Sequence, residues 1–135
     1  FLAIAVSLED LGGKCNNNRA LILSQTLNEA IGKFLDENKS PSRKVNELDN
    51  RGSHFYLALY WAQALAIQTD DSDLSTEFSR CADILQKEEV TIINELNAAQ
   101  GSPMDIGGYY QPDPKKSAEA MRPCSVFNSA IEGIG

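Results

Sequence analysis

The fold of this chain is decided by the stretch Phe55-Tyr56-Leu57-Ala58-Leu59-Tyr60-Trp61-Ala62-Gln63-Ala64-Leu65-Ala66-Ile67. Its apolar side chains cover most of the circumference of a helix that runs from about residue 52 to residue 68. A helix that is apolar all round is buried on all sides. We therefore expect a central helix that needs more partners than a small free-standing bundle supplies, which suggests a larger parent structure.

Amphipathic helices are expected on both sides of this stretch. Apolar residues recur at helical spacing before and after it, which is typical of helices with one buried face. These positions are Leu23, Leu27, Ala30, Ile31, Phe34 and Leu35 before it, and Leu74, Phe78, Cys81, Ala82 and Leu85 after it. Gly32 costs its helix about 1 kcal/mol relative to alanine, so we expect it to pack closely against a neighbour.

The remaining segments are also predicted to be helical. The expected helices cover residues 1–11, 18–38, 52–68, 73–87, 88–100, 115–121 and 125–131. Gly12-Gly13 should end the first of them, while Asn18 and Ser53 should cap the second and the third. The helix over 88–100 is expected to bury Val90, Ile93 and Leu96. No segment shows strand alternation, so the fold class is all-α, a single helical piece over 1–135.

Composition excludes several classes of protein. The net charge of −7 argues against binding to nucleic acid, which normally needs a basic surface. The acidic residues between 70 and 100 are expected to form a solvated helical face. No apolar run approaches the roughly 20 residues that span a bilayer, so a soluble protein is expected. Cys15, Cys81 and Cys124 are widely spaced, which fits free thiols in a reducing compartment, with Cys81 in the core.

A basic loop between two helices is the strongest candidate for a functional site. Lys39, Arg43 and Lys44 form the only dense basic cluster of this acidic chain, and Pro41 restricts the backbone beside them. Arginine carries a planar fork of donors that matches phosphate oxygens, and Ser42 could add a hydroxyl donor. The arrangement suits a phosphate monoester such as the 2′-phosphate of NADP; from spacing alone, a solvated loop remains the alternative.

The other candidate residues are interpreted as structural rather than as catalytic or metal-binding. Neighbouring residues on a helix point about 100° apart, so Ser53 and His54 are poorly placed as a nucleophile and its base. Nothing in the spacing of Asp105, Asp113 and Glu119 enforces a catalytic pair. No metal cluster can be built, because the chain has one histidine and scattered cysteines. Gly107-Gly108 is interpreted as a turn that positions Tyr109 and Tyr110 against the body of the protein.

Three blocks of this sequence resemble the monomeric isocitrate dehydrogenases. They are Phe34 to Val45 with Glu47 to Ala62; Glu95 to Gly101 with Pro103 and Asp105 to Tyr110; and Ala120 to Pro123 with Phe127 and Asn128. Together they extend from the helix over 18–38 almost to the end of the chain.

The resemblance implies a fold, an activity and one site residue. Enzymes of this family oxidise isocitrate to 2-oxoglutarate and carbon dioxide with NADP and a divalent cation, Mg or Mn. They are large two-domain α/β chains of the isocitrate/isopropylmalate dehydrogenase kind, and this sequence would be the C-terminal part of the first, cofactor-contacting domain. In the family motif Ser-Pro-Ser-Arg-Lys the arginine contacts the cofactor near the adenosine 2′-phosphate, and this residue is Arg43 here.

The same resemblance places catalytic and metal-binding residues outside this sequence. We therefore expect no catalytic residue and no metal ligand here, and no activity of the segment alone. No cofactor contact is assigned to Ser42, Lys44, Arg51 or His54, and their roles stay open. The whole enzyme is expected to be cytoplasmic and monomeric, whereas the separate segment could associate with itself. The competing hypothesis is a stand-alone helical interaction module that binds partners through an exposed apolar helix over residues 55–67.

Overall fold

The computed structural model describes residues 1–135 as seven helices without a strand, which confirms the all-α class. The helices are α1 (Leu2–Cys15), α2 (Asn18–Asp36), α3 (Asn50–Ile67), α4 (Ser72–Lys87), α5 (Glu89–Ala98), α6 (Pro114–Met121) and α7 (Ser125–Glu132). None of the seven helices combines the length and the apolar character that a membrane-spanning helix needs.

Helix α3 occupies the centre of the molecule, as its sequence predicts. It packs against α2, α4 and α5. Phe55, Leu59 and Leu65 are almost completely buried within it. The indole nitrogen of Trp61 donates a 3.0 Å hydrogen bond to Thr26 Oγ1 of α2, so its polar group has a partner as well. The competing module needed this helix to be exposed, and its burial contradicts that hypothesis.

The caps of two helices differ from the expected ones by one to four residues. Asp49, not Ser53, caps α3, because its carboxylate accepts from the backbone N–H groups of Arg51 and Gly52. Ser53 lies inside the helix and donates instead to the carbonyl of Lys39 at 2.7 Å. Asn17 rather than Asn18 caps α2. A cap depends on which residue leaves helical geometry, and several neighbouring polar residues could serve.

The expected end of the first helix at Gly12-Gly13 is wrong. Helix α1 continues through both glycines to Cys15 and ends on Asn16, which adopts a left-handed conformation with φ 53°. A Cβ atom at Gly12 would lie only 2.5 Å from Leu21 Cδ2, so this glycine permits the close approach of α1 and α2. Its role is packing rather than termination.

Two expected burial positions are also wrong. Val90 is 73% exposed, because α5 turns Ile92 and Leu96 towards the core, with Ile93 half-buried. Gly32 has open space where a Cβ would stand, with no atom within 4 Å, so no close neighbour explains it. Cys81, by contrast, is buried as expected.

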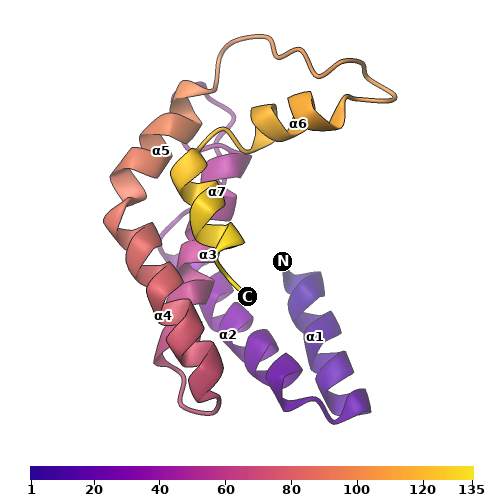
Figure 1. Ribbon diagram of the computed structural model, residues 1–135, viewed down its shortest axis with the longest axis vertical. Helices are drawn as coiled ribbons and strands as arrows, with labels where there is room; N and C mark the ends of the chain where they lie inside the picture. The colour runs from indigo at the N-terminus through magenta and orange to yellow at the C-terminus, as the bar shows by residue number, and fades with distance from the viewer.

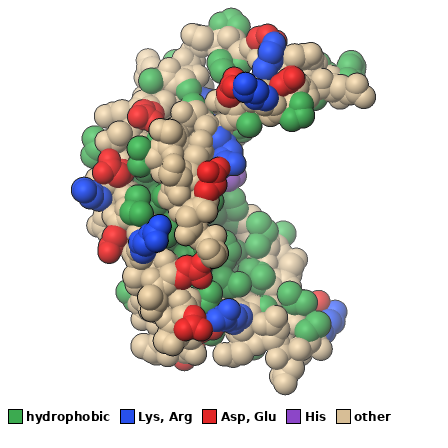
Figure 2. All heavy atoms as spheres, in the orientation of Figure 1, with side chains coloured by type: hydrophobic (Ala, Val, Ile, Leu, Met, Phe, Trp, Pro, Cys, Tyr) green, Lys and Arg blue, Asp and Glu red, His purple; other side chains and the backbone are tan.

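The molecule has the shape of a crescent, with α1 at one end and the segment 101–121 at the other (Figures 1 and 2). Helix α1 packs mainly on α2, while α6 has no extensive contact with any other helix. Tyr109 and Tyr110 lie in the loop before α6 and are 87% and 93% exposed. The expectation that they pack against the body of the protein is therefore wrong for this chain.

Candidate functional site

The basic loop lies between α2 and α3 and is held at several points. The N–H of Ser42 donates to the carbonyl of Leu48 at 2.7 Å and closes the loop on itself. Gln100, after α5, accepts from the N–H of Asn46 and donates to the carbonyl of Glu47, both at 2.8 Å. Asn46 takes a left-handed backbone with φ 66°. The loop is thus positioned by tertiary contacts as well as by its own turn.

Most polar side chains of this loop already have partners within the chain. The hydroxyl of Ser42 donates to Glu47 Oε2 at 2.5 Å, so its proton is not available to a phosphate. Lys44 Nζ lies 3.6 Å from Glu47 Oε1. Lys39 Nζ sits 3.9 Å from the centre of the Tyr56 ring, a cation–π contact. Glu47 is therefore compensated by a hydroxyl and an ammonium group.

Arg43 differs from these neighbours. Its side chain is exposed, and its guanidinium group makes no hydrogen bond or ion pair within the chain. Three other arginines are paired with carboxylates: Arg19 with Asp71, Arg51 with Asp49 and Arg122 with Glu132. Arg80 on α4 is the other arginine without an ion pair, and it lies far from the loop in sequence. Arg43 keeps all its donors free for a ligand, which fits one contact with a phosphate group.

Arg51 and His54, one turn apart at the start of α3, are held by the chain itself. The guanidinium group of Arg51 donates to Asp49 Oδ2 at 2.7 Å and to the carbonyl of Ala120 at 3.0 Å. His54 Nδ1 lies 2.5 Å from the carbonyl of Asn50. Arg51 therefore links the start of α3 to the end of α6.

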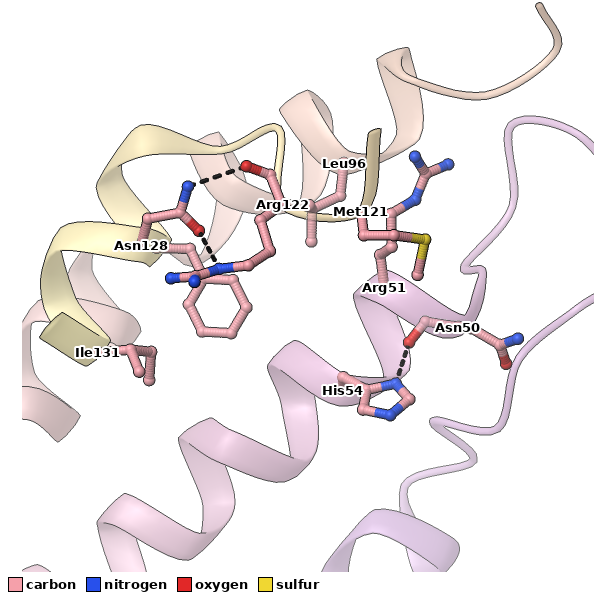
Figure 3. A pocket seen from close by; sticks show the side chains of 9 residues that line it. Asn50, Arg51, His54, Leu96, Met121, Arg122, Asn128 and Ile131 are labelled. Atoms are coloured by element: carbon pink, nitrogen blue, oxygen red, sulfur yellow. Dashed lines mark hydrogen bonds between the residues drawn. The ribbon is translucent and has the colours of Figure 1, made fainter. Parts of the chain in front are cut away.

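A cavity of about 390 Å³ lies beside these residues and was not foreseen from the sequence. Helices α3, α5 and α7 and the segment around Met121 and Arg122 form its walls (Figure 3). Phe127 and Ile131 provide an apolar floor, while Arg122 is fixed by Asn128, whose Oδ1 accepts from Arg122 Nε at 3.2 Å. Its walls come from segments that lie far apart in the chain, so no local sequence pattern indicates the cavity.

No catalytic constellation is assembled by the carboxylates. Asp105 pairs with Lys116, and the neighbouring amide of Gly107 donates to it, so that both interactions lower its pKa. Asp113 caps α6 by accepting from the N–H of Lys116. No group of three or more His, Cys, Asp or Glu side chains could hold a metal ion. The three cysteines are unpaired.

These features describe a crescent-shaped helical segment. Its basic loop is held by hydrogen bonds to residues outside the loop, and its surface is partly apolar. The family described as "Monomeric isocitrate dehydrogenase" matches residues 1–132, and the chain belongs to this family.

Several curated relatives are NADP isocitrate dehydrogenases. The sequence is 55% identical to NADP isocitrate dehydrogenase 2 of Mycobacterium tuberculosis over 134 residues, covering 99% of this chain. It is 56% identical to the NADP isocitrate dehydrogenase of Azotobacter vinelandii over 131 residues, covering 97%. It is 58% identical to the Colwellia maris enzyme over 134 residues, covering 99%. The chain spans 18% of the length of each relative, so it corresponds to a part of a longer enzyme.

Proposed function

We propose that this chain is the part of an NADP-dependent isocitrate dehydrogenase that contacts the 2′-phosphate of NADP through Arg43. The whole enzyme would oxidise isocitrate to 2-oxoglutarate and carbon dioxide while reducing NADP. Within it, residues 1–135 would be the C-terminal part of the first domain. A divalent cation, Mg or Mn, would bind to residues outside this segment, and the unpaired cysteines fit a cytoplasmic enzyme.

The observation that carries this proposal is the free guanidinium group of Arg43 on a loop whose two lysines already have partners within the chain. An exposed guanidinium group is solvated by water, so leaving it without a partner in the protein carries no free-energy cost. The same group can form two parallel hydrogen bonds to a phosphate. Lysine would supply only a point charge at the same place. The relatives' names, which specify NADP, agree with a residue that distinguishes the phosphorylated cofactor.

The chain's own residues would position the cofactor rather than react with it. NADP supplies the nicotinamide ring that accepts the hydride. The hydrogen bonds of Gln100 to Asn46 and Glu47 would hold the backbone of the loop that carries Arg43 before binding, which would reduce the entropy lost when NADP binds. The pairing of Glu47 with Ser42 and Lys44 limits the repulsion that its carboxylate would exert on a phosphate.

The test compares full-length enzyme carrying Arg43→Ala with the wild type and with Arg80→Ala. Both variants remove an exposed arginine without an ion pair, so they share the change in net charge. We expect Arg43→Ala to raise the KM for NADP roughly 10- to 100-fold, the loss of one charged hydrogen bond of about 1.5–3 kcal/mol. The KM for NAD should change little, and Arg80→Ala should alter neither.

Other results would separate the parts of the proposal. If Arg43→Ala keeps the preference for NADP while isocitrate is still oxidised, the enzyme class stands and the residue assignment fails. If the wild-type enzyme reduces neither NADP nor NAD with isocitrate, the activity itself is wrong.

A further inference from the structure

Ser53 is buried inside α3, and yet it bonds to a residue outside that helix. Its side chain is 3% exposed, and its hydroxyl donates a 2.7 Å hydrogen bond to the backbone carbonyl of Lys39. A serine inside a helix commonly donates to the carbonyl four residues earlier, as Ser79 of α4 does towards Ser75. The hydroxyl of Ser53 instead joins α3 to the point where the basic loop leaves α2.

Lys39 is held there by three contacts. Helix α2 ends in a Schellman motif, in which Asn38 takes a left-handed backbone with φ 59° and the N–H of Lys39 donates to the carbonyl of Phe34 at 3.0 Å. The carbonyl of Lys39 accepts from Ser53, and its ammonium group lies over the ring of Tyr56, one turn further along α3. Of these contacts, the hydrogen bond from Ser53 is the one that fixes the backbone of Lys39 to α3.

The position of Lys39 limits where Arg43 can lie. Only three residues separate the two, and the φ angle of the middle one, Pro41, is restricted by its ring. The far end of the loop is held by the two hydrogen bonds of Gln100. The backbone is therefore fixed on both sides of Arg43, and a shift at Lys39 would move the guanidinium group relative to the rest of the molecule.

We propose that Ser53 is a positioning residue for NADP, which fixes the start of the basic loop and thereby sets the place of the Arg43 guanidinium group at the 2′-phosphate. This role rests on the proposed contact of Arg43 with NADP. Ser53 acts through the loop rather than on the cofactor, because its hydroxyl is buried and already donates to Lys39. Placement matters because two parallel hydrogen bonds form only when the guanidinium plane is aligned with the phosphate oxygens.

The test measures the Kd of the full-length enzyme for NADP and for NAD by titration calorimetry, in Ser53→Ala and in the matched control Ser24→Ala. Ser24 is equally buried, at 3%, and lies inside α2, where its hydroxyl donates to the carbonyl of Ala5 in α1 at 2.8 Å. We expect Ser53→Ala to raise the Kd for NADP about 3- to 10-fold, the change that the loss of one neutral hydrogen bond produces. The Kd for NAD, and both values in Ser24→Ala, should change by less than about twofold.

Two further measurements separate positioning from a purely structural role. In an enzyme that already carries Arg43→Ala, the added change Ser53→Ala should alter the Kd for NADP by less than about twofold, because the group that Ser53 positions is gone. In the enzyme without NADP, hydrogen exchange of residues 39–48 should become at least about threefold faster in Ser53→Ala and should stay unchanged in Ser24→Ala.

Three results would overturn this role of Ser53 and leave the contact of Arg43 intact. An unchanged Kd for NADP in Ser53→Ala would show that the loop keeps its place without this hydrogen bond. Additive losses in the double variant would show that Ser53 affects NADP by a route other than Arg43. Equal effects of Ser53→Ala and Ser24→Ala would indicate a general loss of stability. A fourth result, an unchanged Kd for NADP in Arg43→Ala alone, would overturn the phosphate contact and this role together.

Discussion

At the scale of single residues, Asp49 stabilises the start of α3 directly and, through Arg51, its contact with the end of α6. It caps α3 and pairs with Arg51, which also donates to the carbonyl of Ala120. Burial acts to raise the pKa of Asp49, but the hydrogen bond from Arg51 and the N–H of Gly52 outweigh it, so the pKa lies below its usual value. The charged form is therefore the one that stabilises the fold.

We predict that Asp49→Ala destabilises the start of α3 by roughly 1–3 kcal/mol at neutral pH, because a cap and the partner of Arg51 are both lost. A lowered pKa means that this stabilisation is present above about pH 4 and is lost as pH falls through the folded value. The difference between variant and wild type should shrink accordingly in acid. Hydrogen exchange of residues 50–56 in the full-length enzyme, compared between variant and wild type, measures this difference in stability.

The control for this prediction is Asp36→Ala. Asp36 ends α2, is exposed, and has no ion pair or side-chain hydrogen bond in the structure. Its replacement by alanine should change the free energy of opening, measured by hydrogen exchange in α3, by less than about 0.5 kcal/mol. An acid-independent effect of Asp49→Ala would contradict the role assigned to its charge.

At the scale of helices, α2 contains a glycine, Gly32, that lowers its stability. Gly32 lies on its exposed side, and a Cβ there would meet no atom within 4 Å. Glycine lowers helix stability because the unfolded backbone has more freedom to lose. No packing contact in this chain offsets that cost.

We predict that Gly32→Ala stabilises α2 by about 1 kcal/mol. The matched control is Gly52→Ala in α3, where the new Cβ would overlap the side chain of Leu48 and should destabilise the protein. Thermal unfolding of the full-length enzyme should move in opposite directions for the two variants. A loss of stability with Gly32→Ala would indicate that another part of the enzyme approaches this face.

At the scale of the whole molecule, the exposed segment 101–121 is the feature that distinguishes this chain from a compact helical bundle. If this segment contacts the rest of the enzyme, Tyr109 and Tyr110 supply large apolar surface to that contact. We predict that replacing both, Tyr109→Ser with Tyr110→Ser, lowers the thermal midpoint of the full-length enzyme by on the order of several degrees. The control is Val90→Ser on α5, which should leave the thermal midpoint nearly unchanged. Equal thermal midpoints for the two variants would argue against a contact of segment 101–121 with the rest of the enzyme.

Much of the helical fold could be predicted because helix formation is governed by local spacing. The ranges of α4, α6 and α7 agree with the expected ones to within a residue. The central position of α3 followed from its apolar circumference. The errors at the cap of α3 and at Val90 of α5 lie where one turn of helix offers several equivalent choices. The errors at Gly12 and at Tyr109 concern which distant residues pack nearby, which local spacing does not specify. The basic loop and Arg43 could also be identified in advance, and the contact of Arg43 with a phosphate stays a prediction.

The sequence by itself determined the all-α class, the family and the residue type at the candidate phosphate contact, because periodicity and motif are properties of neighbouring residues. Only the tertiary structure decided that Arg43 is unpaired while Lys44 is not, that Gln100 holds the loop, and that distant helices enclose a cavity at His54. It also decided which apolar side chains remain exposed on α1 and on the segment 101–121. These outcomes depend on contacts between residues far apart in the chain, and burial and ion pairing are set by those contacts rather than by local sequence.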